Sequence, residues 1–586
     1  MMTIENPKRR IVEDLKLRNK DNMKIVAGEY FGNKYSYADT FKMFEEYKKA
    51  FIEIDGQNED TITISCPSTI ASVNAFYGAM DANKIVNMTG PGFLHSYTEK
   101  YTRDLNSKTV FMFDGFIDND LIDKFHSAGV KNLIVTSVTD YMNPIVKFIG
   151  TRKGVISKKD IVGDYIKEHK TLPRGMEIIN LKDFTNYGKK CKKQYNFDYE
   201  ENKIAAYFLT GATTSQFPKC VKLYADGITK MSRIYDEMWF DFGVGDRNTV
   251  FIPLFYATGA VHGVHAGLMS GATNIYKPKY DRFAFGKDLL DTKAKIAIVA
   301  PSHVATLEES GLDDGALSHV KYIFIGGEAI MPAQMEKFRK TTSRLGVEYI
   351  LNGYGMTETG SMSGVSDKDS TGGDVSVTPV PGVEYRIVDE NTGEILPDNT
   401  RGVLQKLTPC ATAGYLEEEK NVSLFTQDGW INTGDIAERF SDGKYRIYGR
   451  STDCFTNGGE TFAMYDIEEE ILKLDAVAEA EVIKFKINED EYPAMVVVLN
   501  AEYKQQTVEV LKQLCAIDLP GMRHLLGVKF IENFRTNPVT SKRDYLSLKD
   551  DKKGYYIIDE AVVYISDVGE KRRSVDGRKI EIVKYK

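Results

Sequence analysis

The stretch T-G-A-T-T-S-Q-F-P-K, Thr210–Lys219, is the most informative part of this chain. An apolar run, Ile204–Leu209, precedes it, and the pattern of Val221–Met231 predicts a helix after it. Small residues let backbone N–H groups point at an anion, hydroxyl groups add donors, and the lysine adds positive charge. The stretch is therefore typical of a polyphosphate-binding loop, although it lacks the G-x-x-x-x-G-K-[ST] pattern. The alternative is an ordinary Ser/Thr-rich surface turn.

The overall composition is that of a globular protein with more than one domain. The chain has 586 residues, of which 42% are hydrophobic and 27% charged. A net charge of −8 argues against a nucleic-acid partner, and no apolar stretch is long enough to span a membrane. The six cysteines form no CxxC pair and the N-terminus has no signal-peptide core, so we expect a cytoplasmic protein without structural zinc.

Strand-like and helix-like segments alternate over most of the chain, which predicts an α/β fold with parallel sheets. Residues 1–60 have a helical, charged pattern, and residues 152–193 are expected to form a lysine-rich surface excursion. The expected strands are 61–65, 84–88, 109–113, 132–136, 250–253, 295–300, 320–325 and 346–351. Helices are expected at 68–80, 119–129 and 332–343.

Two of the expected strands end in loops that carry glycine and a carboxylate. These loops are G-G-E-A (326–329) and N-G-Y-G-M-T-E (352–358). Ligands of open parallel sheets lie beyond the carboxyl ends of the strands, so both loops are candidate binding residues.

From about Asp374 the pattern changes to short alternating segments, 384–388, 402–407 and 444–448, which predict a small antiparallel barrel. Beyond a candidate hinge, Gly449–Asp453, segments 465–474, 480–486, 493–499 and 505–517 predict an α+β module. The expected domains are thus 1–448, containing two parallel α/β subdomains and the barrel, and 449–550, a small mobile lid. Residues 551–586 form a C-terminal extension of β-hairpins.

Six motifs occur in one order: the 210–219 loop, G-G-E-A, N-G-Y-G-M-T-E, T-G-D (433–435), G-R-x-x-D (449–453) and N-P-V-T-S-K (537–542). In this order and spacing the chain resembles the adenylate-forming superfamily of acyl-CoA synthetases, luciferases and peptide-synthetase adenylation domains. The resemblance covers about residues 60–548. It implies that ATP activates a carboxylic acid to acyl-AMP, which a thiol then attacks.

The resemblance also assigns roles around the phosphates. Glu358 would bind Mg²⁺ together with Thr214, because a carboxylate beside triphosphate is repulsive without a bridging cation. Lys542 resembles the mobile lysine of the small domain that reaches the carboxylate and the α-phosphate. The phosphate cradle would comprise Thr210, Gly211, Thr213, Thr214, Ser215 and Lys219. A helix N-terminal Glu and a solvated loop Lys are the structural alternatives.

The nucleoside contacts follow from the same resemblance. Tyr354 would stack on adenine, and Asp435 and Arg450 would hold the ribose. A buried core Tyr, a turn Asp and a surface Arg are the structural alternatives. The remaining contacts expected around the nucleoside are Gly327, Glu328, Ala329, Asn352, Gly355, Met356 and Thr357.

An acyl pocket is expected at P-L-F-Y-A-T-G (253–259), which resembles P-x-F-H-x-x-G with Tyr256 in place of histidine. The pocket residues would be Tyr256, Gly259 and His262, with the glycines leaving room for an apolar tail. Simple packing of a glycine-rich helix is the alternative. His262 and His265 lack carboxylate or Cys partners for a metal. An amino-acid substrate is disfavoured, because the Asp that would hold its ammonium group is missing.

Several departures from the family pattern bear on function. Ala212 and Ser215 stand where glycine is common, and Thr452 and Thr456 replace frequent hinge or lysine residues. We expect MgATP, a fatty or aryl acid and CoA as reactants, with an acyl carrier protein as the alternative acceptor. A catalytically weak nucleotide-binding sensor is the second hypothesis.

Overall fold

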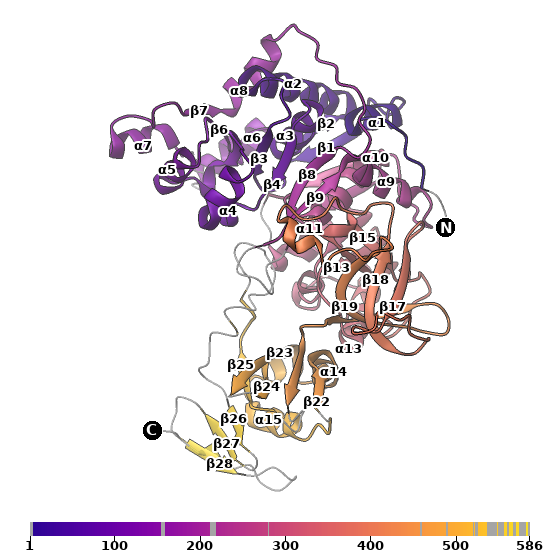
Figure 1. Ribbon diagram of the computed structural model, residues 1–586. Coiled ribbons are helices and arrows are strands. Elements are labelled where there is room, and N and C mark those ends of the chain that lie inside the picture. The colour runs from indigo at the N-terminus through magenta and orange to yellow at the C-terminus, as the bar shows by residue number, and fades with distance from the viewer. Residues whose placement is uncertain are drawn as a thin grey trace.

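A computed structural model shows a large body of two β-sheets, an antiparallel sheet beside them and a smaller C-terminal body (Figure 1). The structure describes residues 4–153, 159–210, 218–278, 281–457, 460–487, 490–519, 521, 525–535, 548, 556–559, 562–565, 570–573 and 582–583. Among these residues no helix is both long and apolar enough to cross a bilayer.

The first sheet has the strand order β7-β6-β5-β3-β4-β8-β9 and is parallel except for its β8–β9 edge. Its strands are β3 (Thr61–Ser65), β4 (Ile85–Met88), β5 (Thr109–Phe113), β6 (Asn132–Thr136), β7 (Glu177–Asn180), β8 (Ile204–Leu209) and β9 (Cys220–Tyr224). Every residue of β3 is buried, as expected for a central parallel strand. The strands predicted at 61–65, 109–113 and 132–136 are confirmed, and the apolar run 204–209 also forms a strand.

Two predictions in this region are wrong. The helix expected at Val221–Met231 begins only at Ala225, because Cys220–Tyr224 forms β9 and pairs antiparallel with β8. The 152–193 segment is not simply a surface excursion: β7 pairs with β6, and the helix that follows buries Phe184. Lysines on its exposed positions conceal this short apolar pattern.

The second sheet has nine strands in the order β16-β15-β14-β13-β12-β10-β11-β1-β2. Its strands are β1 (Val26–Tyr30), β2 (Asn33–Ser36), β10 (Arg247–Val250), β11 (Thr273–Tyr276), β12 (Ile296–Val299), β13 (Tyr322–Gly326), β14 (Tyr349–Met356), β15 (Ser361–Val365) and β16 (Thr378–Pro379). The N-terminal region is therefore not only helical, since β1 and β2 form a hairpin on this sheet. The strand predicted at 250–253 instead ends at Val250.

The expected loop at 352–358 is mostly strand. β14 continues through Met356, and its last residues pair with β13 on one side and β15 on the other. Gly326 and Gly353 are opposite each other in this pairing, and a Cβ on Gly326 would lie 2.7 Å from the Gly353 carbonyl oxygen. Glycine is thus needed here because the two strands approach each other closely. The glycines were taken as evidence of a loop, but they lie within paired strands.

The antiparallel sheet consists of β17 (Glu384–Val388), β18 (Arg401–Leu407), β19 (Ile431–Arg439) and β20 (Tyr445–Arg450). The predicted antiparallel pairing is confirmed, but the described strands form a four-stranded sheet in the order β17-β18-β19-β20 and not the predicted barrel. The long strand β19 was not predicted, although it contains T-G-D; its pairing sets Asp435 opposite Arg450 on β20.

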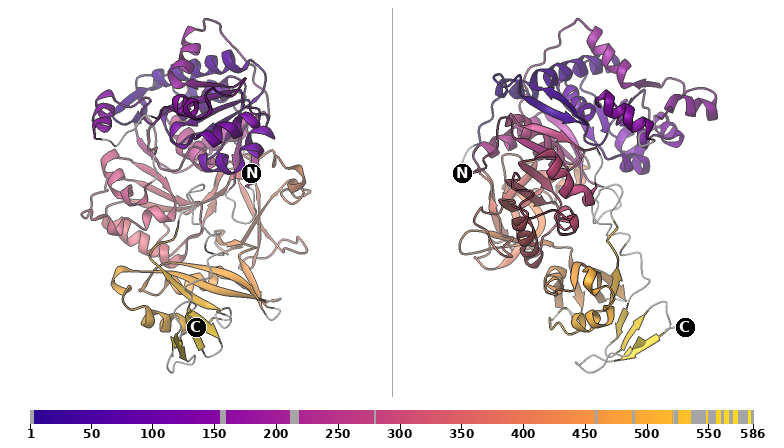
Figure 2. Two further views of the ribbon diagram at one scale, coloured as in Figure 1. Left: turned by 90° about the vertical axis from the view of Figure 1, so that its left-hand side faces the viewer. Right: turned by 180° about the vertical axis from the view of Figure 1, so that it is seen from behind.

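The C-terminal body contains a two-stranded hairpin, β21 (Cys454–Asn457) and β22 (Glu460–Ala463), and a seven-stranded sheet. The sheet comprises β23 (Val477–Ile487), β24 (Asp490–Leu499), β25 (Gly527–Ile531), β26 (Tyr556–Asp559), β27 (Val562–Ile565), β28 (Glu570–Arg573) and β29 (Ile582–Val583). The hairpins expected beyond residue 551 continue this sheet, because β26 pairs with β25. Figure 2 shows these yellow strands at the end of the molecule opposite the first sheet.

Helices pack around the sheets (Figures 1 and 2). The helices of the described chain are α1 (Ile11–Arg18), α2 (Tyr37–Asp55), α3 (Ile70–Asp81), α4 (Pro91–Thr98), α5 (Asn119–Ser127), α6 (Pro144–Arg152), α7 (Ile161–His169), α8 (Leu181–Lys190), α9 (Ala225–Asp236), α10 (Gly267–Met269), α11 (Phe285–Thr292), α12 (Pro301–Val304), α13 (Pro332–Arg344), α14 (Met464–Leu472) and α15 (Thr507–Cys515). The Gly-rich segment Thr258–Ala266 is π-helical (η3) and fully buried after Thr258.

Candidate active site

One large cavity of about 1050 Å³ lies where the second sheet, the antiparallel sheet and the C-terminal body meet. Its lining contains the ends of β13 and β14, the T-G-D and G-R segments, and Glu468 and Lys484 of the C-terminal body. The predicted residues that line it are Thr210, Lys219, Tyr256, His262, Gly327, Glu328, Ala329, Asn352, Tyr354, Gly355, Met356, Thr357, Glu358, Asp435 and Arg450. Residues far apart in sequence thus meet at one place.

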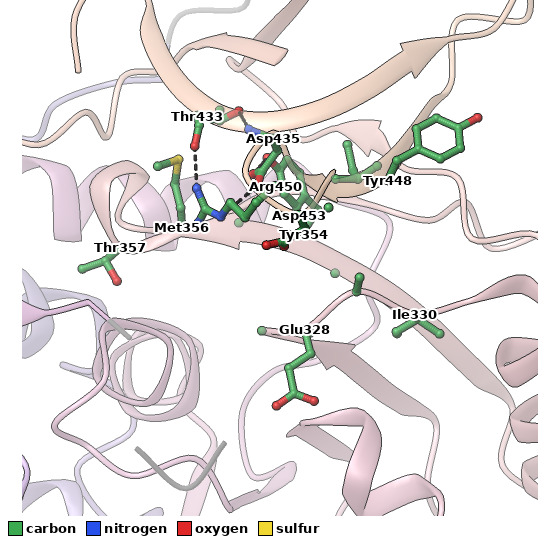
Figure 3. A pocket seen from close by; sticks show the side chains of 18 of the residues that line it. Glu328, Ile330, Tyr354, Met356, Thr357, Thr433, Asp435, Tyr448, Arg450 and Asp453 are labelled. Carbon is green, nitrogen blue, oxygen red and sulfur yellow. Dashed lines mark hydrogen bonds and ion pairs between the residues drawn. The ribbon is translucent and has the colours of Figure 1, made fainter. Parts of the chain in front are cut away.

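Asp435, Tyr354 and Arg450 form a hydrogen-bonded group on the cavity wall (Figure 3). The Tyr354 hydroxyl donates to Oδ2 of Asp435, and Arg450 Nε lies 3.1 Å from Oδ1. Arg450 also donates to the Thr433 carbonyl oxygen at 2.6 Å. Because Asp435 is only 6% exposed and holds two donors, its carboxylate is fixed in one orientation, with lone pairs left for ligand hydroxyls.

Burial, reinforced by the charge of Asp435, raises the pKa of Tyr354 well above its ordinary value. The phenol therefore stays protonated and donates to the carboxylate at all ordinary pH values. Its ring lies at the edge of the cavity, where a flat ligand can stack against it. This arrangement fits the prediction that Tyr354 contacts a base and Asp435 contacts a sugar, and it leaves those roles as predictions.

Glu358 follows β14 in a short helical turn, Thr357–Thr359, and is 6% exposed. Tyr415 donates to its Oε1 at 2.7 Å, and the Lys219 ammonium lies 4.7 Å from the centroid of the Tyr415 ring. A carboxylate, a phenol and an ammonium thus share one wall of the cavity. Tyr415 was missed from sequence, because an isolated G-Y pair carries no local signal; its place comes from a bridge between Val221 and Tyr415.

The structure describes only the two ends of the predicted anion-binding loop. Thr210 and Lys219 close the two ends of the loop: the Thr210 N–H donates to the Lys219 carbonyl at 2.9 Å, and the Lys219 N–H donates to Thr210 Oγ1 at 3.1 Å. Both residues line the cavity. The predicted Gly211, Thr213, Thr214, Ser215 and Lys542 lie outside the described residues.

A second part of the cavity lining, called the neutral end below, carries no charged side chain among its described residues. Tyr235, Tyr256, His262 and Ile298 line it. His262 accepts a hydrogen bond at Nε2 from the Met362 N–H at 2.9 Å, and burial lowers its pKa to about 3. The imidazole is therefore uncharged, and its hydrogen bond to backbone supports packing rather than metal binding.

Gly259 does not leave room for an acyl tail. It is not among the cavity-lining residues, and a Cβ there would lie 2.1 Å from the Pro253 carbonyl oxygen. Gly267 likewise packs against the Asn274 side chain, 2.3 Å from an added Cβ. The acyl-pocket role of Gly259 is therefore wrong, and close packing, against backbone for Gly259 and against a side chain for Gly267, explains both glycines.

Lys406 was also missed. It lies on β18 beneath the Tyr354 ring, with its ammonium 3.8 Å from the ring centroid, and its side chain is buried. A single lysine in an alternating strand reads as solvent-facing, so nothing in the sequence marks it.

Comparison with known proteins finds a family and several relatives that resemble this chain in sequence. The AMP-binding enzyme family matches residues 15–416. A long-chain-fatty-acid–CoA ligase of Bacillus subtilis is 24% identical over 78% of this chain and 79% of its own. The 4-coumarate–CoA ligase-like 1 protein of Arabidopsis thaliana is 23% identical over 71% of this chain and 74% of its own.

Solved structures share the fold. ATP-bound MatB from Rhodopseudomonas palustris superposes with a TM-score of 0.75 and 19% identity, covering 92% of this chain and 98% of its own. The anthranilate CoA ligase AuaEII with anthranoyl-AMP gives a TM-score of 0.75 and 16% identity, covering 92% and 97%. The predicted fold class is confirmed, and the chain belongs to the AMP-binding enzyme family.

Proposed function

We propose that this protein is an AMP-forming acid–thiol ligase. A carboxylate oxygen attacks the α-phosphorus of ATP, the bond to the β-phosphate oxygen breaks, and pyrophosphate leaves with the electron pair. A thiol then attacks the carbonyl carbon of acyl-AMP, giving a thioester, AMP and one proton. The observation that carries this proposal is a single cavity with a charged, hydrogen-bonded end and a neutral end.

The charged end suits a nucleotide. Asp435 is an acceptor held ready for ribose hydroxyls, and Arg450 beside it adds a fixed positive charge. Lys219 adds a second positive charge next to Tyr415 and Glu358, where phosphates would lie. Lys542 would supply the travelling ammonium that binds the carboxylate and the α-phosphate during the first step.

The residues also fit a magnesium ion. Glu358 offers a cavity-lining carboxylate, the ligand type that Mg²⁺ prefers, and one of its oxygens is oriented by Tyr415. Glu358, with Thr214, would hold the ion, which neutralises triphosphate charge when bound. The part played by this chain is to keep the carboxylate oriented and buried.

We propose an apolar monocarboxylic acid, fatty or aryl, as the substrate. Within the described lining, the end formed by Tyr235, Tyr256, His262 and Ile298 presents no Lys or Arg to pair with a second carboxylate. Burying an unpaired charge there would be strongly unfavourable. CoA is the preferred thiol, because the two relatives described above are named as a CoA ligase and a CoA ligase-like protein. The pantetheine of a carrier protein is the alternative acceptor.

The proposed setting is the cytoplasm and fatty-acid or aryl-acid metabolism. All six cysteines are free thiols in the structure, which suits a reducing compartment. The proposed domains remain 1–448, 449–550 and 551–586, with rotation about Gly449–Asp453 between the two chemical steps.

ATP–pyrophosphate exchange across a panel of fatty, aryl, dicarboxylic and amino acids tests the proposal. Fatty or aryl acids should support exchange, and dicarboxylic and amino acids should not. CoA and a holo-carrier protein are then compared as acceptors under the best acid. ATP binding without exchange for any acid would favour the sensor hypothesis, which Thr452 and Thr456 motivate.

Lys542→Ala separates the two hypotheses further. Under catalysis it should slow adenylation by about a hundredfold or more while ATP still binds, the scale of lost transition-state charge stabilisation. Under the sensor hypothesis it should change little.

A further inference from the structure

Lys406 is a buried cation next to the predicted adenine site. Its Nζ lies 3.8 Å from the centroid of the Tyr354 ring and 5.6 Å from that of Tyr385. Its ammonium donates a hydrogen bond to the Ser363 hydroxyl at 2.8 Å, and the residue is 0% exposed. Aromatic faces and a hydroxyl therefore take the place of water around the ammonium.

The ammonium occupies one face of the Tyr354 ring. Lys406 does not line the cavity, whereas Tyr354 does. Since an aromatic ring has two faces, a stacked base must use the other one. A cation on one face draws π-electron density toward itself, which leaves the opposite face poorer in electrons and better suited to an electron-rich purine.

Ser363 ties this group together. Its Oγ accepts from Lys406 and from the Tyr385 hydroxyl at 2.9 Å. Lys406 comes from β18, Tyr385 from β17, and Tyr354 and Ser363 from β14 and β15. The lysine thus joins the antiparallel sheet to the strand that carries the adenine-contacting tyrosine, and fixes the ring between them.

The charges that act on Lys406 come from three elements. Burial lowers its pKa to about 7; Asp435 on β19 raises it, Arg450 on β20 lowers it, and Glu358 after β14 raises it. The neighbouring Tyr354 and Tyr385 stay protonated, because burial raises the pKa of both. Lys406 is therefore expected to change charge near neutral pH, whereas Tyr354 and Tyr385 are not.

We propose that Lys406 is a positioning residue for the nucleotide: its ammonium holds the Tyr354 ring for stacking, and its charge makes nucleotide affinity depend on pH. The proposal rests on the proposed adenylate-forming function. The sign follows from electrostatics. A nucleotide anion favours the protonated lysine, so affinity is highest below pH 7 and falls as the pH rises and Lys406 loses its proton.

The test is calorimetric binding of AMP to the full-length protein from pH 7.0 to 9.0. AMP is used because its phosphate already carries two charges above its second ionisation, near pH 6. For the wild type, affinity should fall about fivefold over this range, the scale of a partly buried cation–π contact. Lys406→Met should bind AMP about fivefold more weakly at pH 7.0, with a flat pH profile.

Two further variants sharpen the result. Lys406→Arg keeps the positive charge at every pH, so it should retain affinity at pH 9.0, where the wild type weakens. Lys340→Met removes an exposed helical lysine that forms only an i,i+4 pair with Glu336, and it should behave like the wild type. KM for ATP should rise in Lys406→Met while kcat changes less, as expected for lost ground-state binding.

Proton uptake gives an independent readout if Lys406→Met does not fold. AMP binding to the wild type, measured at pH 8 in two buffers of different ionisation enthalpy, should take up a fraction of a proton. No uptake, or a folded Lys406→Met with wild-type affinity and pH profile, overturns this inference alone. A wild-type protein that binds no AMP at any pH overturns the proposed function as well.

Discussion

The two ends of the cavity are built on different principles. At the end proposed to bind the nucleotide, Asp435, Arg450 and Glu358 are charged, and each is held by a named hydrogen bond or ion pair. At the end proposed to bind the acid, His262 is buried, Tyr256 is partly buried, and both are neutral. Under the proposed function, charge fixed in place binds the nucleotide, which is the reactant common to the whole family, whereas a neutral wall selects the acid by shape. We expect substitutions at the charged end to impair activity, and substitutions at the neutral end to change the preference for the acid substrate.

The largest effect should come from Glu358→Gln. The amide keeps the size of the side chain but loses the negative charge expected to hold Mg²⁺ near the phosphates. Adenylation, measured as ATP–pyrophosphate exchange, should slow by about a hundredfold or more. Tyr415→Phe is the matched control: it removes only the hydrogen bond that orients Glu358, so it should cost far less. Equal losses in the two variants would mean that orientation, not charge, matters.

Asp435→Asn should act on binding. It breaks the ion pair with Arg450 and removes an acceptor for ribose hydroxyls, so AMP should bind about 30-fold more weakly, a loss of about 2 kcal/mol. Calorimetry with AMP measures this directly. Asp442→Asn, at an exposed turn, is the control. Unchanged affinity in Asp435→Asn would move the ribose away from this carboxylate.

Tyr256→Ala should shift substrate preference and leave the nucleotide alone. Removing the ring deepens the neutral end, so kcat/KM for a longer acid should rise relative to a shorter one by about tenfold. AMP affinity should stay within about twofold of the wild type, because Tyr256 lies at the other end. If AMP binding and acid preference change together, the two ends are not separate.

Two buried histidines, one at the neutral end and one behind the cavity lining, should make stability depend on pH. Burial lowers the pKa of both His262 and His265 to about 3, against about 6.5 when unfolded. The unfolded state therefore binds protons that the folded state refuses, so stability is retained above pH 6.5 and is lost as the pH falls. Each histidine contributes a loss of about 1.4 kcal/mol per pH unit below 6.

Urea denaturation at pH 7.0, 6.0 and 5.0 checks this. His262→Gln retains an acceptor for the Met362 N–H but cannot be protonated in this range. Its unfolding free energy should fall less steeply with decreasing pH than that of the wild type. Parallel slopes would show that His262 is solvated in the folded protein.

The sequence predicted the charged end better than the neutral one, for a physical reason. Asp435 and Arg450 belong to short motifs whose chemistry is local, and the β19–β20 pairing brings them together. Lys406 and Tyr415 reach the site only through tertiary packing, and no local pattern distinguishes them from ordinary strand and turn residues.

The fold shows the same contrast. The strand Thr61–Ser65 was predicted because apolar and polar residues alternate along it with the period of a strand, although the structure buries both faces. Val221–Tyr224 was predicted to be helical because V-K-L-Y suits either state, and its pairing with β8 makes it a strand. The prediction for Gly259 was wrong because a glycine can either leave space for a ligand or allow close packing, and the sequence does not distinguish the two. In the structure the Pro253 carbonyl oxygen lies against Gly259, which shows close packing.

The central claim is that the acid itself attacks the α-phosphate, and oxygen labelling tests it most directly. An acid that carries oxygen-18 in its carboxylate is turned over with ATP and CoA, and the AMP is examined by mass spectrometry. The account predicts one labelled oxygen in each AMP, because the carboxylate oxygen stays on phosphorus when the thiol displaces adenylate. Unlabelled AMP, or ADP as the product, would contradict it.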